Sequence, residues 1–183
     1  MKREAAYQLL TEYTQKDSLI KHALAVEAAM RAYAEKFGED VEAWGCVGLL
    51  HDFDYEKYPS MEDHPFRGAE ILREKDYPDD WITAILGHAN HTGTPRETLM
   101  AKTLYAVDEL CGFITAVAYV RPNRSLTEVK VKSVKKKMKD KAFARQVNRE
   151  EILDGVRELG VELDDHIAFV IAAMQKISDK LGL

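Results

Sequence analysis

Five of the six histidines in this 183-residue sequence lie between residues 22 and 91. Imidazole nitrogens mixed with carboxylate oxygens form the donor set of many transition-metal sites. Taken singly, each histidine has a plain structural interpretation, because neutral imidazole is often found inside proteins. The chemistry therefore has to be argued from a set of residues, whose members in chain order are His22, His51, Asp52, His64, His88 and Asp108.

Asp108 is the most informative member of this set. It lies four residues after Leu104 and three before Cys111, in a segment that is apolar nearly all round. Burying an unpaired carboxylate costs on the order of several kcal/mol. No lysine or arginine occurs between Lys102 and Arg121 to compensate the charge. A metal ion would compensate it, with imidazoles from other segments completing the coordination shell.

The order of these residues resembles the HD superfamily of metal-dependent phosphohydrolases. The pattern is a histidine, a His-Asp pair about thirty residues later, and a distant aspartate, here His22, His51-Asp52 and Asp108. His64 and His88 resemble the two extra histidines of the binuclear members. The resemblance covers about residues 19–115. Many relatives continue the pair as His-Asp-Ile-Gly, whereas this chain reads His-Asp-Phe-Asp. It also lacks the Gly-Tyr-Pro signature of relatives that cleave cyclic dinucleotides.

The resemblance implies an activity and a cofactor. One cation would be held by His22, His51, Asp52 and Asp108. If a second one binds, Asp52 would bridge and His64 and His88 would complete the other shell. A nitrogen-rich donor set suits Mn, Fe, Co, Ni or Zn. The implied reaction is hydrolysis of a phosphate ester by a metal-activated water, with a nucleotide or a small phosphorylated metabolite as substrate.

Three further side chains are candidates for the same site. His91 lies three residues after His88 and is a candidate proton donor to the leaving group, a further ligand or a surface residue. Lys57 and Arg67 follow the His-Asp pair and His64 closely, so each is a candidate for holding a phosphate oxygen. A solvated surface charge is an equally good interpretation of both. The sixth histidine, His166, follows two aspartates and is expected at the surface.

Helical periodicity runs through nearly the whole chain and predicts an all-α fold. We expect one compact HD-type helical bundle over residues 1–183, with a core over about 19–115 and a C-terminal helical extension over about 124–183. The expected helices span residues 4–14, 17–37, 41–51, 63–75, 79–88, 97–120, 126–139, 149–159 and 163–181.

Composition predicts a cytoplasmic protein. Two cysteines form neither a disulfide framework nor a zinc-finger pattern, and no apolar leader follows the charged N-terminus. The longest nearly uncharged run, Thr103 to Val120, contains Asp108 and Glu109 and is therefore a poor membrane span. The formal net charge of -5 argues against nucleic acid as the main partner. We expect a small phosphorylated molecule and no membrane; the sequence sets no oligomeric state.

Two alternative functions stay open at this point. The six-residue pattern also resembles the di-iron oxygenases of the same superfamily, such as inositol oxygenase. The other alternative is a non-catalytic nucleic-acid-binding module that uses residues 130–141, which hold seven lysines in twelve positions. Val131, Val134 and Met138 interrupt this run at helical spacing, which favours a solvated amphipathic helix instead.

Overall fold

Ten α-helices and two 3₁₀ helices make up the regular structure of residues 2–183, the part of the chain described by the computed structural model. The prediction of an all-α fold is confirmed. The α-helices are α1 (Arg3–Tyr13), α2 (Asp17–Phe37), α3 (Val41–Leu50), α4 (Phe66–Glu74), α5 (Asp79–Gly87), α6 (Leu99–Tyr119), α7 (Val131–Met138), α8 (Arg149–Leu159), α9 (Leu163–Gln175) and α10 (Ser178–Leu181). The 3₁₀ helices are η1 (Asn90–Thr92) and η2 (Leu126–Glu128).

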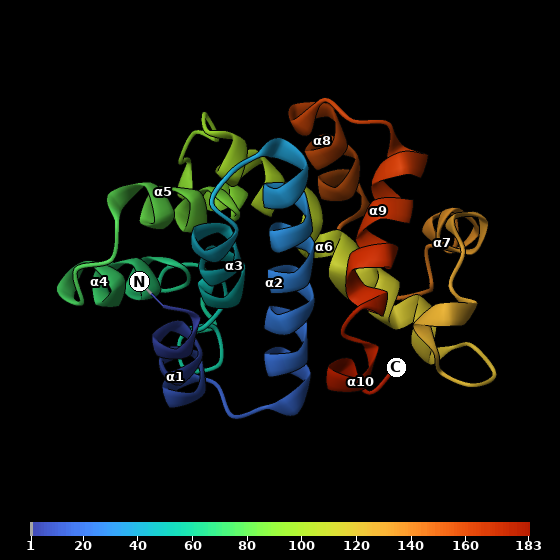
Figure 1. Cartoon of the computed structure of the whole chain (residues 1–183), viewed down its shortest axis with the longest axis horizontal. Helices are drawn as coiled ribbons and strands as arrows, with labels where there is room; N and C mark the ends of the chain where they lie inside the picture. The colour runs from blue at the N-terminus through green and yellow to red at the C-terminus, as the bar shows by residue number, and fades with distance from the viewer. Residues whose placement is uncertain (1) are drawn as a thin grey trace.

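Helices α2 and α6 form the centre of the molecule. In Figure 1, α2 stands upright in the middle of the view, with α3, α4 and α5 on one side and α7, α8 and α9 on the other, while α6 crosses behind it. Helix α3 packs along α2, and α8 packs along α6. Helix α6 also contacts α2, α5 and α9. This arrangement accounts for its sequence, because a helix covered on several sides is apolar nearly all round.

Small residues allow the close approaches in this core. A Cβ added at Gly48 of α3 would lie 3.0 Å from the Glu27 backbone of α2. A Cβ added at Gly155 of α8 would lie only 2.6 Å from Cα of Ala106 on α6. Helices α3 and α8 are therefore seated against the two central helices at distances that exclude any larger residue without movement.

Three stretches depart from the predicted helix boundaries. The helix expected from residue 63 begins at Phe66, because residues 61–65 form turns. The stretch 126–139 starts as η2, and its α-helix begins at Val131. The helix expected over 163–181 is broken at Ile177, where φ is −123° and ψ is 19°. This break turns α10 back toward α2 and buries Leu181 in the core.

The prediction for His166 is wrong, because this side chain is buried. The Tyr33 hydroxyl of α2 donates a hydrogen bond to its Nδ1 at 2.5 Å, and its Nε2–H donates to the carbonyl oxygen of Ala106 at 2.9 Å. Both ring nitrogens are thus satisfied by a neutral imidazole. The sequence did contain the signal: His166 precedes Ile167 and lies four residues before Val170, on the buried stripe of α9.

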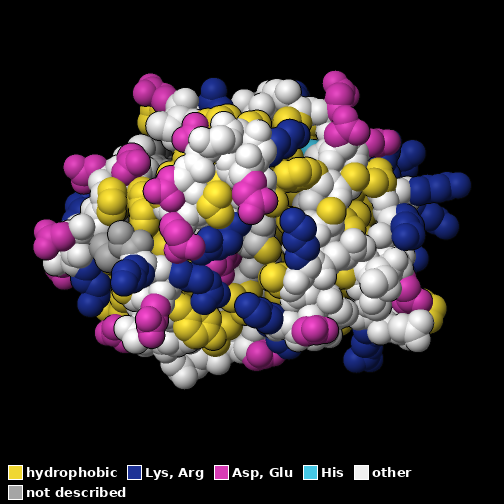
Figure 2. Space-filling view, viewed as in Figure 1, with side chains coloured by type: hydrophobic (Ala, Val, Ile, Leu, Met, Phe, Trp, Pro, Cys, Tyr) yellow, Lys and Arg dark blue, Asp and Glu magenta, His cyan; other side chains and the backbone are white. Residues whose placement is uncertain are grey.

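The lysine-rich stretch lies at one end of the molecule. Figure 2 shows Lys and Arg side chains gathered at the right-hand edge, over α7 of Figure 1. Val134 is buried beneath this helix, as the helical spacing predicted. Lys135 pairs with Asp164 of α9 at 2.6 Å. Among the described residues, none of the helices is long and apolar enough to cross a membrane.

Candidate metal centre

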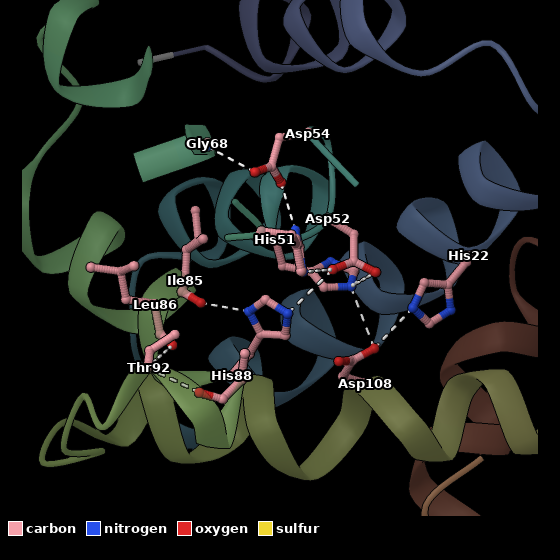
Figure 3. A network of polar contacts seen from close by, with 12 residues as sticks. His22, His51, Asp52, Asp54, Gly68, Ile85, Leu86, His88, Thr92 and Asp108 are labelled. Atoms are coloured by element: carbon pink, nitrogen blue, oxygen red, sulfur yellow. Dashed lines mark hydrogen bonds and ion pairs between the residues drawn. The ribbon is translucent and has the colours of Figure 1, made fainter. Parts of the chain in front are cut away.

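All six side chains of the predicted set converge on one region, although they come from five different parts of the chain. His22 is on α2 and Asp108 on α6, 86 residues apart in sequence, and His22 Nε2 lies 2.9 Å from Asp108 Oδ1. His51 and Asp52 follow the last turn of α3, and His88 follows α5. Figure 3 shows these side chains pointing toward one another. His64 reaches the same region from the turn that precedes α4.

The six residues divide into two groups of three. In one group the donor atoms of His22, His51 and Asp108 all lie within 4.8 Å of one another. In the other group, the donor atoms of Asp52, His64 and His88 meet the same limit. Each group offers three protein ligands, a number that leaves room for a water or a substrate in the shell of a catalytic ion.

Asp52 lies between the two groups. Its Oδ1 is 3.2 Å from Nε2 of both His64 and His88. Its Oδ2 is 3.4 Å from Nε2 of His51, which belongs to the other group. The two carboxylate oxygens therefore face different groups, an arrangement that suits a bridging ligand.

Hydrogen bonds fix the orientation of three of the imidazoles. The Nδ1–H of His51 donates to the carbonyl oxygen of Gly48 at 2.7 Å, and that of His88 donates to the carbonyl oxygen of Ile85 at 2.5 Å. His64 Nδ1–H donates to Asp54 Oδ1 at 2.8 Å. Each of these rings consequently carries its lone pair on Nε2, the nitrogen that faces the carboxylates. Protein metal sites hold their histidine ligands in this way.

One buried atom indicates that the region is built to hold a cation. His51 Nε2 is fully buried and lacks a hydrogen-bond partner among the described residues. A polar atom left in this state costs about 1–3 kcal/mol. Both Asp52 and Asp108 have an oxygen 3.4 Å from it. A divalent transition metal would take the Nε2 lone pair and neutralise the two carboxylates, so the residues present fit such an ion.

The electrostatics of the two aspartates favour positive charge in this region. Burial acts to raise the pKa of Asp108, but the imidazoles of His51 and His22 outweigh it and hold that pKa below its ordinary value. The pKa of Asp52 is lowered in the same way by the neighbouring imidazoles of His51, His64 and His88. Both carboxylates therefore stay ionised, as metal ligands must.

A cleft of about 480 Å³ opens beside the two groups. Asp52, His64, His88, His22 and Asp108 line it, together with Tyr55, Met61, Asn90, His91, Glu109 and Glu151. Clefts of this size hold small metabolites. The cleft gives a substrate access to the carboxylates and imidazoles, whereas His51 lies buried behind them.

The structure places the other three candidate residues differently. His91 lines the cleft, and its Nε2–H donates to the carbonyl oxygen of His64 at 2.8 Å, outside both groups of donors. Lys57 Nζ donates to the carbonyl oxygen of Glu12 at 3.1 Å and lies over the ring of Tyr13, away from the cleft.

Arg67 is also outside the cleft lining. It is exposed on α4 and pairs with Asp63 at 3.2 Å and Glu70 at 3.0 Å. Lys57 and Arg67 are thus directed to carbonyl and acidic groups of the protein itself. We assign neither side chain to a phosphate oxygen in the cleft.

Three acidic residues of this region were missed in the sequence. Asp54 is buried, accepts from His64 through Oδ1 and accepts from the Gly68 backbone N–H through Oδ2 at 2.8 Å. Glu109 lines the cleft next to Asp108. Burial, with the neighbouring charge of Asp108, raises the pKa of Glu109 to about 8. Glu151 comes from α8. Asp54 carried one signal, its place two residues after Asp52.

The comparisons with known proteins agree with this geometry. The sequence model of the HD domain family matches residues 19–112, and the chain belongs to that family. The resemblance seen in the sequence is therefore confirmed. HD domains bind divalent metals and are generally metal-dependent hydrolases, and the two donor groups of this chain can hold such ions. No solved structure matches the chain.

Proposed function

We propose that this protein is a metal-dependent phosphohydrolase that cleaves a phosphate ester with two divalent cations. The observation that carries the proposal is Asp52, which turns one oxygen to His51 and the other to His64 and His88. One ion would be held by His22, His51 and Asp108, and the other by His64 and His88, with Asp52 contributing to both positions. Mn, Fe, Co, Ni and Zn all suit this donor set.

A pair of bound cations lowers the pKa of a water and screens the charge of a phosphate group. The side chains of the protein define the positions that the cations would occupy. Asp52 supplies negative charge to both positions from a single side chain. The hydrogen bonds to Gly48, Ile85 and Asp54 keep three imidazoles aimed at those positions. Such preorganisation removes the reorganisation that the same groups would need in water.

We assign the proton for the leaving group to His91. This imidazole lines the cleft beside the two groups without belonging to either. Its Nε2–H is engaged with the carbonyl oxygen of His64. Nδ1 is therefore the nitrogen that can serve the leaving group. In the imidazolium form Nδ1–H gives its proton to the departing oxygen, which leaves a neutral ring that still carries Nε2–H and later regains a proton from solvent.

Replacement of Asp52 tests the proposal. Asp52→Ala removes the carboxylate that lies between the two groups, and Asp52→Asn keeps the shape but removes the charge. We expect both variants to lose metal and to lose phosphate release by two orders of magnitude or more, roughly the effect of deleting one catalytic electrostatic contact. Metal content is measured by mass spectrometry, and phosphate release on a panel of nucleotides and sugar phosphates with Mn, Co, Ni and Zn.

The matched control is Asp63→Ala, an aspartate that pairs with Arg67 outside the cleft. Circular dichroism checks that all variants stay helical, and oxygen uptake is followed on the same panel to test for oxygenase chemistry. A folded Asp52→Ala protein with parental metal content and parental turnover would contradict the proposal. So would substrate-dependent oxygen consumption without phosphate release.

A further inference from the structure

Carboxyl groups and imidazoles supply the ionisable groups that line the cleft beside the metal centre. Among the described residues, neither lysine nor arginine contributes to its walls. Glu109 and Glu151 add two carboxyl groups to those of Asp52 and Asp108. Proteins that bind chains of phosphates ordinarily contact them with arginine or lysine side chains. This cleft therefore differs in composition from a polyphosphate site.

Two guanidinium groups on neighbouring elements are engaged with other parts of the protein. Arg96 forms two 2.7 Å hydrogen bonds with the Glu158 carboxylate and donates to the carbonyl oxygen of Gly87 at 2.8 Å. Arg149 donates to the carbonyl oxygens of Ala144 and Val147 at 2.6 and 2.7 Å. Turning either guanidinium toward the cleft would break several charge-assisted hydrogen bonds, so the acidic character of the cleft is fixed by the fold.

Glu151 is held at the cleft by two amides. Its Oε1 accepts from Asn148 Nδ2 at 2.8 Å and from Asn90 Nδ2 at 3.3 Å. The structure records no hydrogen bond to Oε2 from residues 2–183. Helix α8, which carries Glu151, is itself seated on α6 by Gly155, against the backbone of Ala106. A partly buried carboxylate with one free oxygen is thus presented on a rigid element.

Charge balance then limits what the cleft can accept. Two divalent cations would exceed the charge of Asp52 and Asp108 by two, and Glu151 reduces this excess to one. One phosphate monoester, with a charge of about −1.5 to −2, is therefore enough to neutralise it. A second phosphate on the same substrate would face Glu151 and the carboxyl group of Glu109 without any cation. A hydroxyl or ammonium group in the same place would donate a hydrogen bond to Glu151.

We infer that the substrate is a monophosphate ester of a small polyhydroxy or amino alcohol, and that Glu151 selects it against compounds with a second phosphate. The inference rests on the proposed phosphohydrolase function and names the substrate class of that site. Glu151 acts here as a specificity residue, through contact with the alcohol part of the substrate. The ester bond itself lies at the two groups of metal donors.

Three compounds on one sugar scaffold test the inference: glucosamine 6-phosphate, glucose 6-phosphate and glucose 1,6-bisphosphate. We expect the metal-loaded parent protein to bind and cleave them in that order of preference. Glu151→Gln removes the charge with little change of shape, and should reduce the advantage of glucosamine 6-phosphate over glucose 1,6-bisphosphate by roughly tenfold or more, as for loss of a hydrogen bond to a charged group. The matched control is Glu150→Gln, the same change on an exposed neighbour outside the cleft.

Affinity is measured by calorimetry in excess metal, and kcat/KM by phosphate release, so that binding is read independently of turnover. Preference of the parent for the bisphosphate in binding, or an unchanged ratio in Glu151→Gln, would overturn the inference. If the expected order of binding is found but none of the compounds is hydrolysed, the ligand class stands and the phosphohydrolase function is overturned. The two ideas can therefore fail separately.

Discussion

Asp54 lies outside both groups of metal donors, yet it fixes the orientation of the His64 imidazole, which belongs to one of these groups. Its carboxylate spans two contacts, accepting from His64 Nδ1 and from the backbone N–H of Gly68. Gly68 matters because a Cβ there would lie 2.8 Å from the carboxylate carbon of Asp54. The glycine leaves room for the carboxylate, the carboxylate orients the imidazole, and the imidazole presents Nε2 to Asp52.

Two different substitutions should therefore have the same effect on metal binding. Asp54→Ala deletes the hydrogen-bond acceptor of His64, and Gly68→Ala displaces it. Each substitution should therefore weaken metal binding at the His64 and His88 position by about 10–100-fold, while the ion near His22 and Asp108 is retained. Metal content per chain and competition with a chromophoric chelator measure both ions. Alanine favours helix over glycine by about 1 kcal/mol. A Gly68→Ala protein that is merely more stable, with both ions bound at parental affinity, would contradict the prediction.

The residues that can be predicted from sequence are those whose chemistry is unusual for their surroundings. Asp108 stood out because a carboxylate in an apolar helix needs compensation, and the order of the histidines supplied the rest. Asp54, Glu109 and Glu151 gave little such signal. A loop aspartate, and glutamates beside polar positions, are common without any role, and only the packing of α8 on α6 brings Glu151 to the cleft.

At the scale of the helices, His166 joins three elements through its two ring nitrogens. It lies on α9, accepts from Tyr33 of α2 and donates to Ala106 of α6. Burial disfavours the charged imidazolium and lowers the pKa of His166 to about 4, so the folded protein holds the ring neutral. The position of α9 on the two central helices therefore depends on the protonation state of one side chain.

Acid should loosen this contact in a predictable way. Near neutral pH, His166 is unprotonated in both states and contributes no pH dependence. Below the ordinary value of 6.5 the unfolded chain takes up a proton that the folded protein excludes until about pH 4, so stability falls between these values. The loss by pH 5 should be on the order of 2 kcal/mol. His166→Gln keeps a donor and an acceptor without a titrating group.

Urea unfolding of the parent and of His166→Gln at several pH values gives the free energy of unfolding of each protein. The difference between the two proteins, followed over pH, measures the contribution of His166. The variant should be the less stable protein near pH 7.5, because the imidazole packs in the core. The difference in the free energy of unfolding should narrow as the pH is lowered to 5, since only the parent has a His166 that takes up a proton on unfolding. A gap that stays constant over this range would show that the buried ring does not control the acid response.

Sequence periodicity predicted the helices well and their ends less well. Helices α2 and α6 are long amphipathic or apolar segments, so their identity follows from local pattern alone. The break between α9 and α10 does not, because residues 163–181 keep helical spacing across it. It is favoured by the burial of Leu181 against the N-terminal half of the fold, a contact between distant parts of the chain.

At the scale of the whole molecule, the buried apolar residues form one continuous cluster. It extends from Ala6 of α1 to Leu181 of α10 and includes side chains from every α-helix between them. We propose on this ground that the chain is a single domain, in which the C-terminal helices complete the core of the HD domain. The metal donors come from α2, α6, the segments after α3 and α5, and the turn before α4. Their convergence therefore requires the central packing to be intact.

Metal binding should consequently stabilise the whole fold rather than one loop. An ion that binds only the folded state adds about 2.7 kcal/mol at a concentration 100 times its Kd. For a chain of this length, 1 kcal/mol raises Tm by roughly 2–4 °C. Calorimetry should therefore show one transition that moves up by about 5–10 °C for each ion bound when Mn, Co, Ni or Zn is added after chelation. The relief of the orphaned His51 Nε2 is the local source of this gain.

The Asp52→Ala variant provides the decisive comparison for this last prediction. Its Tm after chelation should lie close to that of the chelated parent, because the lost carboxylate faces the cleft and no core side chain is removed. Its response to added metal should be much smaller, since each proposed ion then lacks the oxygen that Asp52 would supply. If metal raised the Tm of both proteins equally, the ions would be binding elsewhere. Two separate transitions, only one of them shifted by metal, would show that the C-terminal helices unfold independently of the metal centre.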